Sequence, residues 1–360
     1  MAKYKLGDIC EIVSGSTPKT SIEEYWDGDI KWITPAEIND DTYIVTDSVR
    51  KITDLGAKKT GLSPFPEGTV ILSSRAPIGK VAIAGCAMCC NQGFKNLICS
   101  EKILNKYLYW FLKGNTSFLN SLGRGATFKE ISKSIVSQIE INVPDIEYQK
   151  EAVDILEKVS EVISLRKQEL TALDDLIKAR FVEMFGDPVA NPYGYEKVAL
   201  SELAEIKIGP FGSLLHKEDY IEGGHALLNP SHIIDGKVTP DNKLTISAEK
   251  FLELSAYHLK KDDVVLGRRG EMGRCAVVPC DGYLCGTGSL VIRKKGEVTA
   301  DYIQKIISFP SFKKLIEDMA VGQTMPNLNV PIVSNFQIIK PPMGIQNSYY
   351  RFVEQVDKSK

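Results

Sequence analysis

Three groups of basic, amide and hydroxyl side chains occur in each half of this chain, and their chemistry suits DNA binding. Lys and Arg neutralise backbone phosphates, the Arg fork matches O6 and N7 of guanine, and Asn or Gln matches adenine. We predict that the DNA-binding residues are Ser73, Ser74, Arg75 and Lys80, then Asn91, Gln92 and Lys95, then Arg124, Thr127 and Lys129, and in the second half Arg268, Arg269 and Arg274, then Thr287 and Ser289, then Gln323, Thr324 and Asn327.

The first of these groups keeps its charges in both halves. Arg75 aligns with Arg269 in the second half, and Lys80 aligns with Arg274. A solvated hairpin turn is the alternative interpretation, but the recurrence favours contact with DNA. The other two groups differ in residue type between the halves, as two domains with different target bases would require.

Motifs for catalysis are incomplete. The segment 191–193 (Asn-Pro-Tyr) lacks the second proline of an adenine methyltransferase loop and fits a turn better. The Gly-x-Gly fragments at 123–125 and 286–288 do not continue into a cofactor fingerprint. The Gly-Lys pairs at 79–80 and 236–237 lack the earlier glycine of a P-loop. These patterns favour a chain with no catalytic residues.

The eight cysteines do not form paired C-x-x-C units, and only four histidines could assist them as metal ligands. We therefore predict no metal site and expect free thiols buried in strands, as in a reducing compartment. The polar first residues and the lack of an apolar run of about 18 residues favour the cytoplasm. A net charge of −2 means that any DNA-binding surface must come from local placement of Lys and Arg.

The two halves of the chain are copies of one unit. The strongest match aligns 70–75 and 79–82 with 264–269 and 273–276, and the order of matches is the same along both halves. At 360 residues the chain has room for about two domains. The repeat therefore predicts two domains of the same fold, and this prediction does not depend on their function.

Between the copies, apolar or long side chains recur in alternating steps of four and three, which is typical of a coiled-coil helix. No Gly or Pro interrupts 146–185, and Gly186 and Pro188 end the pattern. We predict a helix of roughly 60 Å over 145–185, which binds a partner helix. Its predicted contact positions are Leu156, Val159, Ile163, Arg166, Leu170, Leu173, Ile177 and Arg180.

The partner helix is expected to be the corresponding segment after the second copy, supplying acids or carbonyls to the two arginines. That segment begins at the position that the repeat predicts, because Gln346, Phe352, Val353 and Val356 align with Gln149, Ile155, Leu156 and Val159. It reaches Lys360 after about four turns, so the second helix is short.

This organisation resembles the DNA-specificity subunit of type I restriction-modification systems, over essentially the whole chain. The resemblance is carried by the repeat, the helix after each copy and the segments Met184-Phe185-Gly186-Asp187-Pro188, Leu6-Gly7-Asp8-Ile9, Gly15-Ser16-Thr17-Pro18, Ala76-Pro77-Ile78-Gly79 and Asn91-Gln92-Gly93-Phe94-Lys95. The short second helix departs from the family pattern.

The resemblance implies that each domain reads one half of a split double-stranded DNA site, while the helices set the spacing and bind methylation subunits. S-adenosylmethionine, Mg and ATP would bind the partner subunits and not this chain. Expected partners are DNA, two methylation subunits, restriction subunits and, because the second helix is short, a second copy of the chain. No membrane is expected.

The predicted fold class is α+β, with two α/β target-recognition domains at 1–144 and 188–343, a helix at 145–187 and a truncated helix at 344–360. Short strands are expected at 30–33, 70–72, 81–83 and 96–98, and helices near 104–112 and 302–307. A protein-interaction scaffold that oligomerises through the rod is the alternative function, and a free-standing DNA modification enzyme is a second alternative.

Overall fold

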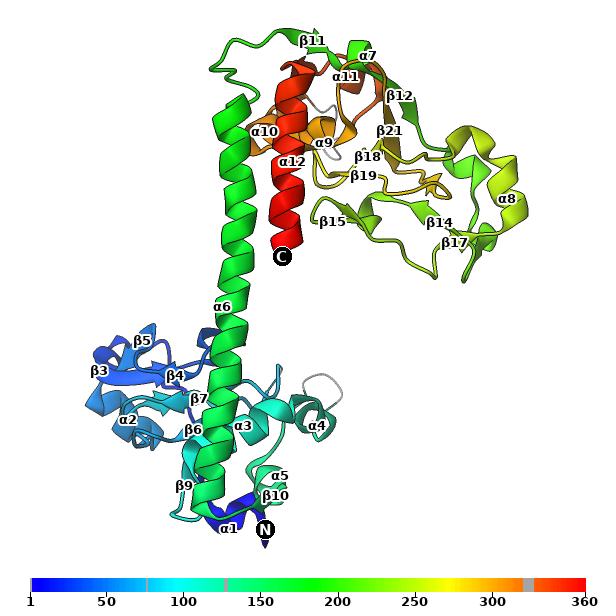
Figure 1. The fold of residues 1–360 in the computed structure, drawn as a ribbon. Helices are drawn as coiled ribbons and strands as arrows, with labels where there is room; N and C mark the ends of the chain where they lie inside the picture. Colours follow the sequence, from blue (N-terminus) through cyan, green and yellow to red (C-terminus); the bar gives the residue numbers. More distant parts are fainter. Residues whose placement is uncertain (1, 76, 126–128, 320–326) are drawn as a thin grey trace. The chain divides into compact units, whose positions relative to one another are not determined.

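The computed structural model describes residues 2–75, 77–125, 129–319 and 327–360 (Figure 1). The chain forms two compact units, Met1–Lys167 and Gln168–Lys360. The boundary falls inside the longest helix, α6 (Ile146–Phe185), so each unit includes one part of that helix. The two units are described separately below.

Unit 1 is built on a five-stranded sheet in the order β2-β9-β6-β7-β4 and a three-stranded sheet in the order β5-β3-β8. A two-stranded ribbon, β1-β10, brings the beginning and the end of the domain together. The strands are β1 (Ala2–Lys5), β2 (Cys10–Ser14), β3 (Trp26–Ile33), β4 (Ile44–Val45), β5 (Arg50–Ile52), β6 (Val70–Leu72), β7 (Val81–Ala84), β8 (Cys89–Cys90), β9 (Lys95–Cys99) and β10 (Glu140–Val143), and the helices before α6 are α1 (Leu6–Ile9), α2 (Asp54–Thr60), α3 (Asn105–Gly114), α4 (Thr116–Ser121) and α5 (Lys133–Ser137).

Unit 2 has a four-stranded sheet in the order β12-β21-β18-β19, a second sheet in the order β13-β17-β14-β20, and the ribbons β11-β22 and β15-β16. Its strands are β11 (Lys197–Ala199), β12 (Ala204–Ile208), β13 (Tyr220–Ile221), β14 (His225–Leu228), β15 (Ile233–Ile234), β16 (Lys237–Val238), β17 (Thr245–Ile246), β18 (Asp263–Gly267), β19 (Cys275–Val277), β20 (Leu284–Cys285), β21 (Ser289–Lys294) and β22 (Gln337–Ile339), and its further helices are α7 (Leu200–Leu203), α8 (Ala248–Glu253), α9 (Ala300–Ser308), α10 (Pro310–Met319), α11 (Val330–Ser334) and α12 (Met343–Ser359).

The two units share one topology, which confirms the duplication. The order β2-β9-β6-β7 of unit 1 corresponds to β12-β21-β18-β19 of unit 2, and every neighbouring pair in both orders is antiparallel. The parallel pair β3-β8 corresponds to β14-β20. In each unit the closing ribbon leads directly into a long helix, α6 or α12. The predicted fold class is therefore confirmed.

The central strands are apolar on both faces because each sheet is covered on both sides. In β6, Val70 and Leu72 face a core formed with α3, whereas Ile71 faces a second core with Ile33 and Phe94. β18 of unit 2 divides its residues between two cores in the same way. A short uninterrupted apolar run is the pattern of such a strand.

Helix α6 has clear start and stop signals. The Asp145 carboxylate accepts a hydrogen bond from the backbone N–H of Tyr148 at 2.9 Å, which caps the first turn. At the other end Gly186 has φ 73°, a left-handed conformation that suits glycine. The predicted limits, 145–185, differ by one residue from the observed helix. Among the described residues, no helix is long and apolar enough to span a membrane.

Helix α12 packs against the part of α6 that belongs to unit 2, as the sequence predicts. The Tyr349 hydroxyl donates to the Ile177 carbonyl at 3.4 Å, and the Lys360 ammonium contacts Asp174 at 2.7 Å. One expectation is wrong: α12 offers Arg180 an aromatic ring, that of Phe352 at 5.6 Å, rather than an acid or a carbonyl. The acid comes from Glu183 on α6 itself, at 2.7 Å.

Candidate nucleic-acid interface

Three loops of unit 1 meet at the backbone of Ser74. The Ser74 N–H donates to the Gly93 carbonyl at 2.7 Å, and the Ser74 carbonyl accepts from the Ile131 N–H at 2.9 Å. Glu130, next to Ile131, exchanges two backbone hydrogen bonds with Arg124, each of 3.0 Å. The three residue groups predicted separately from the sequence therefore lie side by side. We call residues 73–75, 91–95, 124–125 and 129–131 the three-loop edge of unit 1.

Unit 2 repeats this arrangement at Arg268, which takes the place of Ser74. The Arg268 N–H donates to the Gly288 carbonyl at 2.9 Å, and its carbonyl accepts from the Leu328 N–H at 3.0 Å. Residues 267–269, 286–290 and 327–328 are the three-loop edge of unit 2. Because the same backbone bonds recur, Arg75 and Arg269 occupy equivalent positions in the two units.

Four of the predicted residues are buried, and their polar atoms bind inside the protein. The Ser73 hydroxyl donates to the Pro77 carbonyl at 2.8 Å, and the Ser289 hydroxyl donates to the Leu228 carbonyl at 3.0 Å. Ser74 and Lys95 are also buried. These four side chains shape the edge rather than present a surface, which corrects the inclusion of all four among residues that touch DNA directly.

Lys95 is a buried cation with a partner that the sequence analysis missed. Its ammonium contacts the Glu130 carboxylate at 3.3 Å and the Ser74 hydroxyl at 3.3 Å. The other oxygen of Glu130 contacts Arg75 at 3.0 Å, so one carboxylate holds two cations. This cluster fixes the loops of unit 1 relative to each other, because a buried charge is stable only with partners. The repeat gave no signal for Glu130, since Asn327 stands at the equivalent position.

The recurring pair Lys80 and Arg274 has a structural explanation. The Lys80 ammonium donates to the Pro35 carbonyl at 3.0 Å, and the Arg274 guanidinium donates to the Pro230 carbonyl at 3.4 Å. The two prolines are equivalent in the repeat. Both cations thus tie a hairpin to the same neighbouring turn, so their recurrence follows from the fold and is not by itself a sign of DNA binding.

The exposed members of the predicted set are the ones that can meet a ligand directly. Arg124, Lys129, Gln92 and Arg269 are exposed, and Arg75 is exposed but paired with Glu130. The half-buried members are Lys80, Asn91, Arg268, Arg274, Thr287 and Asn327. Thr127, Gln323 and Thr324 lie outside the described residues.

Arg268 and Arg269 make the three-loop edge of unit 2 strongly cationic. The Arg268 guanidinium donates to the Leu328 carbonyl at 3.1 Å, which holds its side chain along the edge. Burial, together with the charge of Arg269, lowers the pKa of Arg268. Two adjacent guanidinium groups with no carboxylate on the described part of this edge form a surface that attracts an anion.

The cysteines of the described structure are free thiols. Burial raises the pKa of Cys89 to about 11 and the pKa of Cys90, Cys275 and Cys285 to about 12, so these thiols stay protonated. These four thiols lie in strands, as predicted, whereas Cys86 lies half-buried between β7 and β8 and Cys280 lies in an exposed loop. No group of three or more His, Cys, Asp or Glu among the described residues could hold a metal ion.

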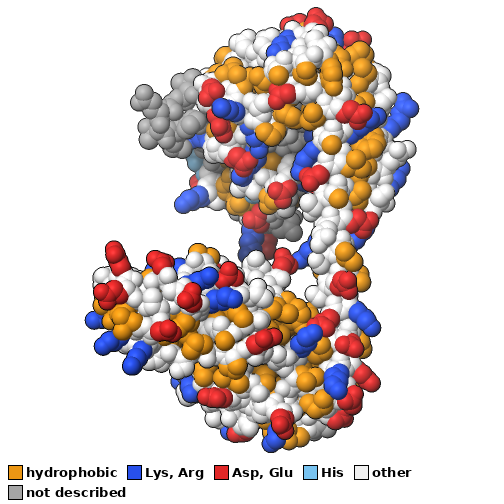
Figure 2. Space-filling view, turned by 90° about the vertical axis from the view of Figure 1, so that its left-hand side faces the viewer, with side chains coloured by type: hydrophobic (Ala, Val, Ile, Leu, Met, Phe, Trp, Pro, Cys, Tyr) orange, Lys and Arg blue, Asp and Glu red, His pale blue; other side chains and the backbone are white. Residues whose placement is uncertain are grey.

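The predicted contact positions of α6 fall into two groups. Ile177 is buried, and Leu170, Leu173 and Arg180 are half-buried on the side of α12 and unit 2. Earlier in the helix the apolar residues are 39% to 64% exposed, and we call them the apolar stripe: Ile155, Leu156, Val159, Val162, Ile163 and Leu165. Hydrophobic side chains on this helix are visible at the surface in Figure 2. Arg166, another predicted contact position, also has an interaction partner in the structure.

Two copies of one sheet-and-helix unit, each with a three-loop edge that carries arginine and amide side chains, define a duplicated DNA-recognition protein. The chain belongs to the family described as the type I restriction modification DNA specificity domain, whose model matches residues 1–174 and 192–360. It is a specificity subunit, the DNA-recognition component of a restriction-modification system and not a catalytic one.

Two relatives in Methanocaldococcus jannaschii illustrate the similarity. The type I restriction enzyme MjaIX specificity subunit is 29% identical over 97% of this chain and 85% of its own length. The MjaVIII specificity subunit is 20% identical over 98% of this chain and 85% of its own length. Both alignments cover the two units, so the similarity extends to the whole duplicated organisation.

Solved structures share the fold. The type I restriction-modification S subunit from M. genitalium has 15% identity and a TM-score of 0.57, with 99% of this chain and 89% of that chain covered. A chain from a study of complex assembly and conformational transition of the type I restriction-modification system has 18% identity and a TM-score of 0.62, covering 99% and 90%.

Proposed function

We propose that each three-loop edge reads one half of a bipartite double-stranded DNA site. The observation that carries this proposal is the convergence of three separately predicted residue groups on one edge in both units. Exposed Arg269, Arg124 and Lys129 supply cations, and Gln92 supplies an amide. Base edges require such donors, and phosphates require such charges. The two edges differ in residue type, which suits two different half-sites.

We further propose that the apolar stripe of α6 binds methylation subunits, two for each chain. The residues of α12 that correspond to Ile155, Leu156 and Val159 are Phe352, Val353 and Val356, and these are covered by packing. The equivalent residues are therefore packed in α12 but exposed in α6. This difference supports a protein contact at the apolar stripe of α6. Restriction subunits and a second copy of the chain are further candidate partners.

In this proposal the chain itself binds no cofactor. S-adenosylmethionine, Mg and ATP act in the partner subunits, where the chemistry takes place. The proposal assigns the protein to the cytoplasm, where its DNA substrate is found and where its free thiols remain reduced.

Co-expression with the neighbouring methyltransferase gene, followed by mapping of modified sites across the genome, tests the reading function. The expected result is one bipartite motif of two short half-sites separated by unspecified bases. A duplex with that motif should be bound with an affinity that falls steeply as salt rises. If no motif appears and the duplex is bound with negligible affinity, the chain is a protein-interaction scaffold instead.

The docking proposal is tested with Val159→Glu and Val162→Glu, two exposed positions where a charge does not disturb a core. We expect the purified complex to lose its methylation subunits, while the chain alone unfolds at the same temperature as before. Leu252→Glu, at a 71% exposed position in unit 2, is the matched control. The mass of the intact wild-type complex counts the methylation subunits and reveals any restriction subunit or second copy.

A further inference from the structure

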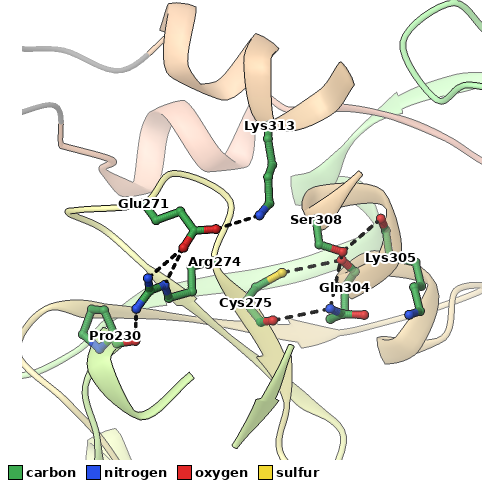
Figure 3. Close-up of polar contacts among 8 residues, drawn as sticks. All are labelled: Pro230, Glu271, Arg274, Cys275, Gln304, Lys305, Ser308 and Lys313. Atoms are coloured by element: carbon green, nitrogen blue, oxygen red, sulfur yellow. Dashed lines mark hydrogen bonds and ion pairs between the residues drawn. The ribbon is translucent and has the colours of Figure 1, made fainter. Parts of the chain in front are cut away.

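A polar cleft of about 430 Å³ lies within unit 2, outside its three-loop edge. Its walls come from the β18–β19 hairpin, the helices α9 and α10, and the turn between β15 and β16. Figure 3 shows Arg274 and Lys313 in contact with the carboxylate of Glu271, and Lys305 further along the cleft beside Ser308 and Gln304. The volume is within the range of small-molecule sites.

Three cations and two carboxylates, Glu271 and Asp235, line this cleft, so its charges are not balanced. Glu271 contacts Arg274 at 2.7 Å and Lys313 at 2.9 Å, so one carboxylate serves two cations. The shared contacts hold the pKa of Glu271 below its usual range. The fixed geometry leaves an excess of positive charge on the side of the cleft formed by the hairpin and α10.

Lys305 adds a third cation, and burial lowers its pKa. Asp301 and Asp357 attract its charge, but among the described residues no carboxylate forms an ion pair with it. A partly buried cation without a counter-ion is destabilising. An anion that entered the cleft would remove this cost. Ser308 lies beside Lys305, and its hydroxyl donates a long hydrogen bond of 3.3 Å to the Lys305 carbonyl, which a stronger acceptor could replace.

Unit 1 shows that the fold does not require a lysine at the position of Lys305. The backbone N–H groups of Leu104 and Thr299 bond to the equivalent glutamines Gln149 and Gln346, which aligns α3 with α9 and places Trp110 at the position of Lys305. Trp110 packs there against Tyr109, with ring centroids 5.1 Å apart. Unit 1 also has a cleft at this place, of about 410 Å³, but the rings of Tyr109 and Trp110 line it where unit 2 has Gln304 and Lys305.

We propose that this cleft of unit 2 binds the phosphoryl group of a phosphate ester through Lys305, Lys313 and Arg274. The cleft is larger than one phosphoryl group, so the rest of the molecule has room. The source is the DNA backbone or a free phosphate. The backbone source rests on the proposed DNA-reading function, since the hairpin that carries Arg274 also carries Arg268 and Arg269 of the three-loop edge. The free source is independent of that function.

The test compares Lys305→Met with the wild type, and Lys314→Met is the matched control because Lys314 is an exposed lysine on α10 that does not line the cleft. Methionine keeps most of the length of the lysine stem. At constant ionic strength, inorganic phosphate should raise the melting temperature of the wild type and of Lys314→Met but not of Lys305→Met. That result shows that the cleft binds a phosphoryl group, and it assigns the cleft to free phosphate if the salt dependence of DNA binding is the same in Lys305→Met and the wild type.

For a DNA source, the affinity of the full chain for its duplex is measured against salt concentration. The slope of log K against log salt should fall in magnitude by about 0.9 in Lys305→Met and stay unchanged in Lys314→Met. A chain that binds no duplex at all would contradict the proposed function. In that case the change in melting temperature with inorganic phosphate alone tests whether the cleft binds a phosphoryl group. If neither the melt nor the slope separates Lys305→Met from Lys314→Met, the cleft does not bind a phosphoryl group and the proposal is overturned.

Discussion

At the residue scale, the cluster of Lys95, Glu130 and Arg75 shows how two copies of a fold can reach the same loop geometry by different means. Unit 1 uses a buried ion pair between Lys95 and Glu130 at 3.3 Å. In unit 2 the equivalent positions hold Leu290 and Asn327, and the Arg268 side chain bonds to the Leu328 carbonyl instead. The polar cluster of unit 1 is therefore one solution among at least two.

We expect Glu130→Gln to cost about 1–3 kcal/mol of stability, because it leaves the buried Lys95 ammonium with no counter-ion. The double variant Lys95→Leu with Glu130→Asn reproduces the residues of unit 2 and should recover most of this loss. Thermal unfolding of the single and double variants measures the coupling. Equal losses for the single and the double variant would contradict a coupled pair.

Thiol exposure leads to a second prediction. Cys280 is exposed, whereas burial raises the pKa of Cys89, Cys90, Cys275 and Cys285 to about 11 or 12. Because the thiolate is the reactive form, a thiol whose pKa is raised has little thiolate at pH 8. Alkylation of the native chain, mapped by mass spectrometry, should modify Cys280 first and these four only after unfolding. Early labelling of Cys275 or Cys285 would show that the core of unit 2 opens readily.

At the element scale, patterns that repeat over many residues were the most predictable. The limits of α6 followed from a long heptad pattern bounded by Gly186, and β6 followed from a three-residue apolar run between polar loops. The candidate site was predicted less well, because the sequence shows residue type but not burial. Lys95 and Ser74 have the chemistry of DNA contacts, yet both point into the protein, and Glu130 was missed because its counterpart is Asn327.

The repeat aligns a glutamine at the start of each long helix, but the sequence does not show that this side chain is buried or what it binds. Gln149 accepts from the Leu104 N–H at 2.8 Å and donates to the carbonyls of Lys102 at 3.0 Å and Pro144 at 2.9 Å. Gln346 accepts from the Thr299 N–H at 3.3 Å and donates to the Pro341 carbonyl at 2.9 Å. The same side chain thus joins the helix to its domain in both units.

Replacing Gln149 with leucine should cost about 2–4 kcal/mol, because one buried and two partly buried backbone groups lose a partner. Gln346→Leu removes two bonds, one of them long, and should cost less. Calorimetry gives the two losses, and hydrogen exchange at the first turns of α6 and α12 should rise in the matching variant only. Gln355→Leu, at an exposed position of α12, is the control. A larger loss for Gln346→Leu would contradict this ranking.

At the scale of the whole molecule, duplication separates recognition into two independent parts. Each three-loop edge is built from residues of a single unit, and the hydrogen bonds that shape it stay within that unit. A change on one edge therefore has no described bond through which to alter the other. The recognition motif should behave as two half-sites that can be changed one at a time.

Arg269→Gln removes an exposed guanidinium from the edge of unit 2, and Arg124→Gln removes one from the edge of unit 1. If Arg269 reads a base, its loss costs about 1–3 kcal/mol at one base pair and relaxes that position only. Mapping of modified sites should then show a change confined to one half-site for Arg269→Gln and to the other for Arg124→Gln. Uniform weakening on all duplexes would instead identify a phosphate contact, and a change in both half-sites from one substitution would refute independent reading.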